Sequence, residues 1–230
     1  FLSLSLGDYR TRSLGARAAI ASAQPVGTTA LAAGQVRING VDVPESRADG
    51  LSSLDPAASA AAKAAAINDV EGRTGVHAEA MAAQVTGQAP IQSVLLDGVA
   101  NSLTINGIKI PAVSVQAGDD TRSLATVINQ MTNATGVRAS IDASGVLTLT
   151  GVDGRNVQID GVGQAAQRLG LSTTPGDLSL TLTGRVELTS SQPFTVEDPA
   201  GLIGLGAQQQ VATDAASALE NADLTTADGA

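Results

Sequence analysis

The sequence of 230 residues contains no cysteine, no tryptophan and very few other aromatic residues. Without cysteine, disulfide bridges and thiolate sites are excluded. The aromatic residues are Phe1, Tyr9 and Phe194, so a core has to be built from Val, Ile, Leu and Ala within a hydrophobic content of 43%. A surface without aromatic anchors is poorly suited to stacking on sugars or bases.

Basic residues are also scarce. Lys and Arg number 13 against 22 Asp and Glu, which gives a formal charge of -9 with no basic stripe, so we expect no nucleic-acid partner. No apolar run approaches the roughly 20 residues that span a bilayer, and we expect no membrane partner. The chain begins at Phe1 without Met and without a basic-then-apolar leader, and we therefore expect both ends to be cut from a longer protein.

A set of short phrases occurs twice. The first copy contains Ile38-Asn39-Gly40, Ile67-Asn68 and Thr74-Gly75-Val76, and the second contains Ile105-Asn106-Gly107, Ile128-Asn129 and Thr135-Gly136-Val137. The later phrases are 61 residues apart and the first phrases 67, so the first copy has six extra residues, which we assign to the connector 45–54. A length change confined to a connector is typical of a duplicated folding unit.

The pattern of each copy predicts a strand, a helix and further strands. In the first copy we expect a strand over 35–43 that Pro44 ends, and a helix over 57–70 that Asp55 caps. In the second copy we expect Asp119, Asp120 or Thr121 to cap the helix and Gly136 to end it. After that helix, alternating residues predict an antiparallel meander over 137–141, 146–150 and 156–159.

The remaining segments are mostly extended. Alternation predicts strands over 2–6, 178–188 and 194–196, and a one-turn helix is expected over 165–169. A short helix is indicated over 214–219. The predicted fold class is therefore α+β, with two small strand-helix-antiparallel-strand modules and extended β segments at both ends. The predicted ranges are an incoming segment 1–34, a first and degenerate module 35–93, a second module 94–172, a β-rich return 173–207 and an outgoing segment 208–230.

Residues that could carry chemistry have simpler interpretations. Residues 161–166 fit the glycine pattern of a dinucleotide site, but the following helix is too short, so a tight turn is favoured. His77 is the single histidine, so a catalytic triad or an imidazole metal site would have to use it alone, and a satisfied or exposed polar residue is favoured. Asp119-Asp120 is better explained by helix capping than by acid-base catalysis. Residues 153–156 lack the spacing of a calcium loop, and Asn133 begins a glycosylation sequon at a predicted helix end. We expect no catalytic, metal or cofactor site and no enzymatic activity.

Twelve residues from the repeated phrases are instead expected to have structural roles. Asn39 and Asn106 can hydrogen bond to backbone at a strand-to-turn junction, where Gly40 and Gly107 allow positive φ. The full set is Ile38, Asn39, Gly40, Ile67, Asn68, Gly75, Ile105, Asn106, Gly107, Ile128, Asn129 and Gly136.

The Ile-Asn-Gly strand, a helix carrying Ile-Asn and then Thr-Gly-Val together resemble the recurring Ile-Asn module of flagellins and hook-associated proteins. Residues 9–16 resemble the stretch where flagellin leaves its N-terminal helical region, and residues 222–230 resemble the approach to its final helix. Flagellins polymerise through long paired helices at their two ends, whereas this sequence shows no sustained heptad pattern. The resemblance implies the outward-facing, central region of a bacterial flagellin, with the terminal helical core largely absent.

The function that the resemblance implies is structural: the exterior of a flagellar filament, a motility polymer outside the cell. It implies export without a cleaved signal peptide, assembly with other flagellin subunits through the missing helices, and possible O-linked glycans on exposed Ser and Thr. The isolated chain is expected to be monomeric, with its two ends close together. The alternatives are a hook-associated junction or cap protein and, with less support, a carbohydrate-binding or adhesin module.

Overall fold

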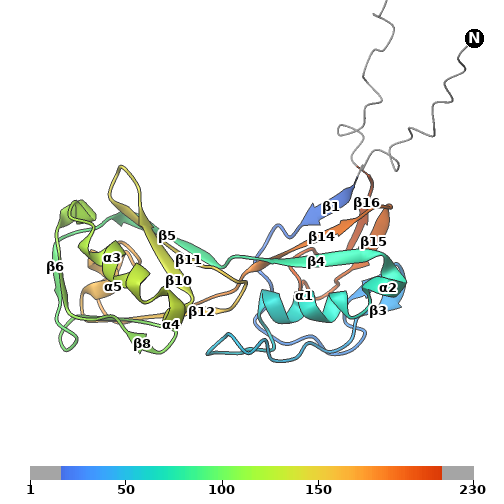
Figure 1. Ribbon diagram of the computed structural model, residues 1–230, viewed down its shortest axis with the longest axis horizontal. Coiled ribbons are helices and arrows are strands. Elements are labelled where there is room, and N and C mark those ends of the chain that lie inside the picture. Colours follow the sequence, from blue (N-terminus) through green and yellow to red (C-terminus); the bar gives the residue numbers. More distant parts are fainter. Residues whose placement is uncertain (1–16, 214–230) are drawn as a thin grey trace, which may run out of the picture.

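The computed structural model describes residues 17–213, which form two lobes side by side (Figure 1). Each lobe has a hydrophobic core of its own. The core of the first lobe draws on residues 18–80 and again on 186–211, whereas that of the second lobe draws on residues 83–182. Short helices and many antiparallel strands confirm the predicted α+β class.

The first lobe contains these elements: β1 (Ala18–Ala21), β2 (Arg37–Ile38), β3 (Val41–Asp42), α1 (Ala60–Asn68), α2 (Glu71–Thr74), β4 (Val76–Met81), β14 (Arg185–Ser190), β15 (Phe194–Glu197) and β16 (Gln208–Val211). The second lobe contains β5 (Gln84–Pro90), β6 (Val94–Leu96), β7 (Ser102–Ile105), β8 (Ile108–Lys109), β9 (Val113–Val115), the 3-10 turn η2 (Ala117–Asp119), α3 (Ser123–Gln130), α4 (Thr132–Thr135), β10 (Val137–Ile141), β11 (Val146–Gly151), β12 (Val157–Val162), α5 (Ala165–Arg168) and β13 (Leu178–Leu182).

The two lobes share one topology. The first lobe has a three-stranded sheet β1-β14-β4 and a four-stranded sheet β16-β15-β2-β3. The second lobe repeats both orders as β5-β11-β10 and β13-β12-β7-β8, and adds the pair β6-β9. The duplication seen in the short phrases therefore extends over the whole described fold.

The second lobe is inserted into the first. β4 and β14 pair antiparallel from Val76↔Ser190 to Arg185↔Met81, and all strands of the second lobe lie between them in the sequence. In the second lobe the equivalent strands β10 and β11 are joined by a short turn. The region 77–87 lacks turn signals because the partner strand of β4 comes from the far side of the insertion.

The chain returns to the first lobe at Gly184. A Cβ atom there would lie 2.3 Å from the carbonyl oxygen of Met81 and 2.9 Å from the Cβ of Ala60, so only glycine fits this crossing. The run 178–188, predicted as one strand, is broken here. β13 pairs with β12 in the second lobe, and β14 pairs with β1 and β4 in the first.

Two further strand predictions are wrong. The segment 35–43 is not one strand but the hairpin β2-β3, because Asn39 and Gly40 both have positive φ (50° and 73°) and reverse the chain. The third strand of the predicted meander, β12, leaves β11 and pairs with β7 and β13 instead. The place next to β11 is taken by β5, which the alternation within one copy could not reveal.

Both predicted helices are present, but the first ends at Asn68 and not at 70, and each is followed by a separate four-residue helix, α2 or α4. α1 begins at Ala60 and not at 57, because the side chain of Ser59, rather than that of Asp55, accepts a hydrogen bond from the Ala62 N–H. In the second copy the N-cap residue is Arg122, not one of the three predicted residues, but the carboxylate of Asp119 accepts from the N–H groups of Leu124 and Ala125 in the first turn. α5 confirms the one-turn helix. The predicted elements at 2–6 and 214–219 lie outside the described residues.

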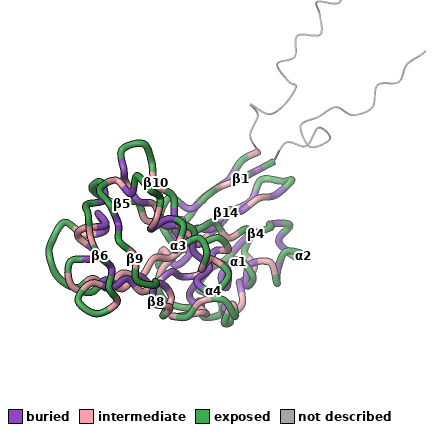
Figure 2. Tube along the Cα trace, turned by 60° about the vertical axis from the view of Figure 1, so that its left-hand side comes forward, coloured by how far each residue is buried: buried purple, intermediate pink, exposed green. Residues whose placement is uncertain are grey.

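Burial follows the same division. Alanine residues of α1 and apolar residues of the sheets are buried between helix and strands, while the outer turns are mostly exposed (Figure 2). Phe194 is the one described aromatic side chain and is buried in the first lobe. Aliphatic side chains therefore form nearly all of both cores, as the composition predicts.

The lobes are joined by hydrogen bonds between the connector 45–56 and the turn that follows β11. Asn156 donates from its backbone N–H to Ser52 Oγ at 2.8 Å, and its side-chain Nδ2 lies 3.0 Å from the carbonyl oxygen of Asp55. The N–H of Ala61, in the first turn of α1, donates to the carbonyl of Gly154. The connector that carries the six extra residues thus contacts the inserted lobe.

Asn156→Ala should weaken the coupling between the lobes. The side chain is buried, and its loss leaves the carbonyls of Leu54 and Asp55 without its amide, so we expect a stability loss of about 1–3 kcal/mol. Two separate cores should then unfold less cooperatively. Calorimetry should show a broader or divided transition, whereas exposed Ser53→Ala should keep the wild-type profile. An unchanged transition for Asn156→Ala would contradict a role for this contact in coupling.

Candidate functional site

The four isoleucines of the repeated phrases lie inside the cores. Ile38 and Ile67 are fully buried in the first lobe, and Ile105 and Ile128 are fully buried in the second. Each pair brings a hairpin strand and a helix to the same core. The polar residue after each isoleucine then lies at the margin of that core.

Asn106 joins three segments of the second lobe. It adopts a left-handed conformation with φ of 51° in the turn between β7 and β8. Its Nδ2 donates to the carbonyl of Thr135 at 2.7 Å, and its Oδ1 accepts from the N–H of Gln158 at 2.8 Å. Its backbone N–H donates to the carbonyl of the same Gln158. One carboxamide therefore ties the hairpin turn to the helix end and to β12.

Asn39 makes the same contacts in the first lobe. Its Nδ2 donates to the carbonyl of Thr74 at 2.9 Å, and its Oδ1 accepts from the N–H of Thr195 at 2.9 Å. Its φ is 50°, and Gly40 follows with φ of 73°. The two junctions are thus equivalent although the partner strand lies 156 residues after Asn39 and only 52 after Asn106.

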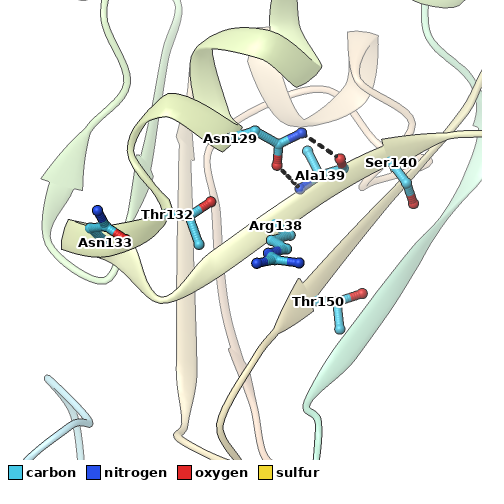
Figure 3. A pocket seen from close by; sticks show the side chains of 7 residues that line it. All are labelled: Asn129, Thr132, Asn133, Arg138, Ala139, Ser140 and Thr150. Atoms are coloured by element: carbon cyan, nitrogen blue, oxygen red, sulfur yellow. Dashed lines mark hydrogen bonds between the residues drawn. The ribbon is translucent and has the colours of Figure 1, made fainter.

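The second asparagine of each unit binds an edge strand. In the second lobe Asn129 Nδ2 donates to the carbonyl of Ala139 at 2.9 Å, and its Oδ1 accepts from the N–H of the same residue at 2.8 Å (Figure 3). In the first lobe Asn68 makes both contacts with Ala78, at 2.9 and 2.7 Å. Each carboxamide therefore fixes its helix beside the strand that follows.

The Thr-Gly pair forms the turn between helix and strand. Gly75 and Gly136 have the same left-handed conformation, with φ of 68° and ψ of 15°. Before them, the hydroxyls of Thr74 and Thr135 donate to a carbonyl one helical turn back and accept from the N–H of the following valine. The two threonines belong to the repeated phrases, so the repeat itself was the signal that marks them.

A buried lysine, Lys63, was missed by sequence reasoning. Lys63 lies in α1 and is fully buried, and its Nζ donates to the carbonyls of Gly27 and Leu202 at 2.6 and 2.8 Å. Burial lowers the pKa of Lys63 to about 8, against the opposing attraction of Asp198. The Asp198 carboxylate accepts from the N–H groups of Leu202 and Ile203, so both charges hold the loop 199–206.

The other polar candidates have local partners. His77 Nδ1 lies 3.0 Å from Glu71 Oε2 at an exposed position, and Asp153 accepts from Arg155 Nε at 2.7 Å. Gly163 is part of a turn with φ of 69° before the four-residue helix α5. Within residues 17–213 there is no group of three or more His, Cys, Asp or Glu placed to hold a metal ion.

A surface depression of about 540 Å³ lies beside β10 (Figure 3). It is lined by Asn129, Thr132, Asn133, Arg138, Ala139, Ser140 and Thr150. Two of these residues, Asn129 and Ala139, are already hydrogen bonded to each other there.

No helix within the described residues is long and apolar enough to cross a membrane.

Comparison with known families bears directly on the second lobe. The family model of the flagellin hook IN motif matches residues 102–153, from the start of β7 to the turn after β11. The chain carries the flagellin hook IN motif. The matched residues include Asn106, Asn129 and Gly136, so in this structure the motif is the hairpin, the helix and the following strand pair that these residues join.

Curated flagellins are similar to a larger part of the chain. Flagellin A of Helicobacter pylori (strain ATCC 700392 / 26695) is 34% identical over 128 residues, which are 54% of this chain and 24% of that protein. Flagellin A of Helicobacter mustelae is 38% identical over 92 residues, 40% of this chain and 18% of that protein. Flagellin B of the same Helicobacter pylori strain is 36% identical over 86 residues, 37% of this chain and 16% of that protein. The matches span a quarter or less of these relatives' length and, with the motif, support a bacterial flagellin.

Replacing Asn106 should separate the contribution of its side-chain hydrogen bonds from that of its left-handed backbone. Asn106→Gly keeps the positive φ and removes only the side-chain hydrogen bonds, so we expect a loss of about 1–3 kcal/mol. Asn106→Ala should cost about 1–2 kcal/mol more, because a left-handed alanine is strained. Urea unfolding would measure both, with Asn39→Gly as the matched change in the first lobe. Wild-type stability of Asn106→Gly would show that these hydrogen bonds contribute little.

Lys63 should make stability depend on pH in a defined window. Its folded pKa of about 8 is below the usual 10.5, so between these values the unfolded chain binds the proton more tightly and stability rises with pH. Lys63→Met should lack this rise, which amounts to at most about 1.4 kcal/mol per pH unit. Urea unfolding from pH 7 to 10 should show the free energy of unfolding of the wild type rising relative to that of Lys63→Met. Exposed Lys109→Met is the control, and a difference that stays constant with pH would refute the shifted pKa.

Proposed function

We propose that this chain forms outer, surface-exposed lobes of a bacterial flagellar filament subunit. The observation that carries the proposal is the match to the flagellin hook IN motif. It is supported by the position of the two ends of the described part, which lie next to each other. Ala18 forms an isolated bridge with Thr213, so the described part of the chain begins and ends side by side in the first lobe (Figure 1). A projection on a polymer requires such adjacent ends.

The role is structural and not enzymatic. The signature asparagines and threonines, the buried lysine and the buried aspartates use their polar atoms in hydrogen bonds that hold the fold together. Catalysis instead requires a nucleophile, a base and an oxyanion donor that converge on an open site. A formal charge of -9 suits the exterior of a polymer, because like charges oppose lateral sticking between copies.

The partners follow from the same proposal. Other flagellin subunits are the partners, and they assemble through helical regions beyond this chain. The localisation is the extracellular filament, reached by export without a cleaved signal peptide. The isolated chain is a monomer, and exposed Ser and Thr are the positions available for O-linked glycans.

A single cysteine in the intact protein would test the placement, because this chain has none of its own. Val99 is 83% exposed in the second lobe, so maleimide dye on cells expressing Val99→Cys should label filaments along their whole length. Ile105→Cys, at a fully buried position, should label far less. Label only at the filament tip or at the hook junction would indicate a hook-associated protein. Label away from flagella would overturn the proposal.

A further inference from the structure

Each lobe has a strand with one free edge. β4 lies at the end of the sheet β1-β14-β4, and β10 lies at the end of the equivalent sheet in the second lobe. The outer N–H and C=O groups of such a strand are a template for pairing with another chain. Pairing of such edges between two copies of the chain would lead to self-association.

The free edge of β10 is occupied by side chains. Asn129 binds both backbone groups of Ala139, and a carboxamide offers the same donor and acceptor as the peptide of a neighbouring strand. At Val137, the N–H donates to Thr135 Oγ1 at 3.2 Å and the carbonyl accepts from Thr132 Oγ1 at 3.0 Å. Four backbone groups of this edge are therefore bound by three side chains from the preceding helices.

The edge of β4 repeats this arrangement with one difference. Asn68 binds both backbone groups of Ala78, and the N–H of Val76 donates to Thr74 Oγ1 at 3.2 Å. Glu71 stands 61 residues before Thr132 in the equivalent position. Its side chain lies 3.0 Å from His77 Nδ1 and not at the Val76 carbonyl, so β4 lacks the fourth contact.

We propose that these side chains form an edge guard, which prevents β10 and β4 from pairing with a second copy of this chain. The guard consists of Asn129, Thr132 and Thr135 on β10 and of Asn68 and Thr74 on β4. The guard binds the N–H and C=O groups of the edge without adding a strand. An added strand would have an open edge of its own, whereas a side chain has none. The inference rests on these contacts alone and does not depend on the filament.

A purely structural role for Asn129 would predict lower stability without association, so the test measures both. Leucine is similar in size to asparagine and cannot bind the edge. For Asn129→Leu in the full chain, sedimentation velocity should show self-association, with an apparent dimer dissociation constant at least about tenfold below that of wild type. Asn133→Leu is the matched control, because it adds the same apolar side chain at an exposed position on α4 and leaves all four contacts in place.

Amide hydrogen exchange locates the new contact. In Asn129→Leu the N–H of Ala139 should exchange faster than in wild type at low protein concentration and become protected again as the concentration rises. Faster exchange without association would overturn the edge guard, and so would equal association of both leucine variants. Should circular dichroism show that Asn129→Leu does not fold, Thr132→Val replaces it, since it removes only the contact with the Val137 carbonyl. It should then show a smaller fall in the dissociation constant, and no fall would overturn the proposal.

Discussion

The fold depends on one hydrogen-bonded joint that is made twice. Asn39 and Asn106 each use a left-handed backbone to turn a hairpin and a carboxamide to bind a helix end and a later strand. Without this joint, the short hairpins β2-β3 and β7-β8 would have little to hold them against the rest of each lobe, because isolated short hairpins are only marginally stable. The buried isoleucine before each asparagine then places the joint at the surface of a core.

The same joint explains how the second lobe can be inserted in the sequence of the first without changing the fold of the first. Strand pairing and carboxamide contacts depend on where segments meet in space, and loop closure adds only a slowly rising entropic cost as the connection lengthens. β4 and β14 therefore pair across an insertion of about a hundred residues, as β10 and β11 pair across a short turn. The longer connector 45–54, with Asp55 directly after it, and the turn 152–156 then hold the two lobes together.

Asparagine and threonine act here as substitutes for backbone. The carboxamides of Asn68 and Asn129 take the place of a neighbouring strand, and buried Lys63 and Asp198 bind the backbone of a loop. These polar groups hold the fold together, which agrees with the structural role proposed for the chain.

The sequence by itself determined the duplication, the fold class, the aliphatic cores, the helix end at Gly136 and the likeness to flagellins. These features are local or periodic, so spacing and residue type reveal them. Tertiary structure alone decided that β14 completes the first lobe, that β12 leaves β11 and that Lys63 is buried between two loops. Those outcomes depend on segments far apart in the chain, where alternation shows that a strand exists but not which neighbour it pairs with.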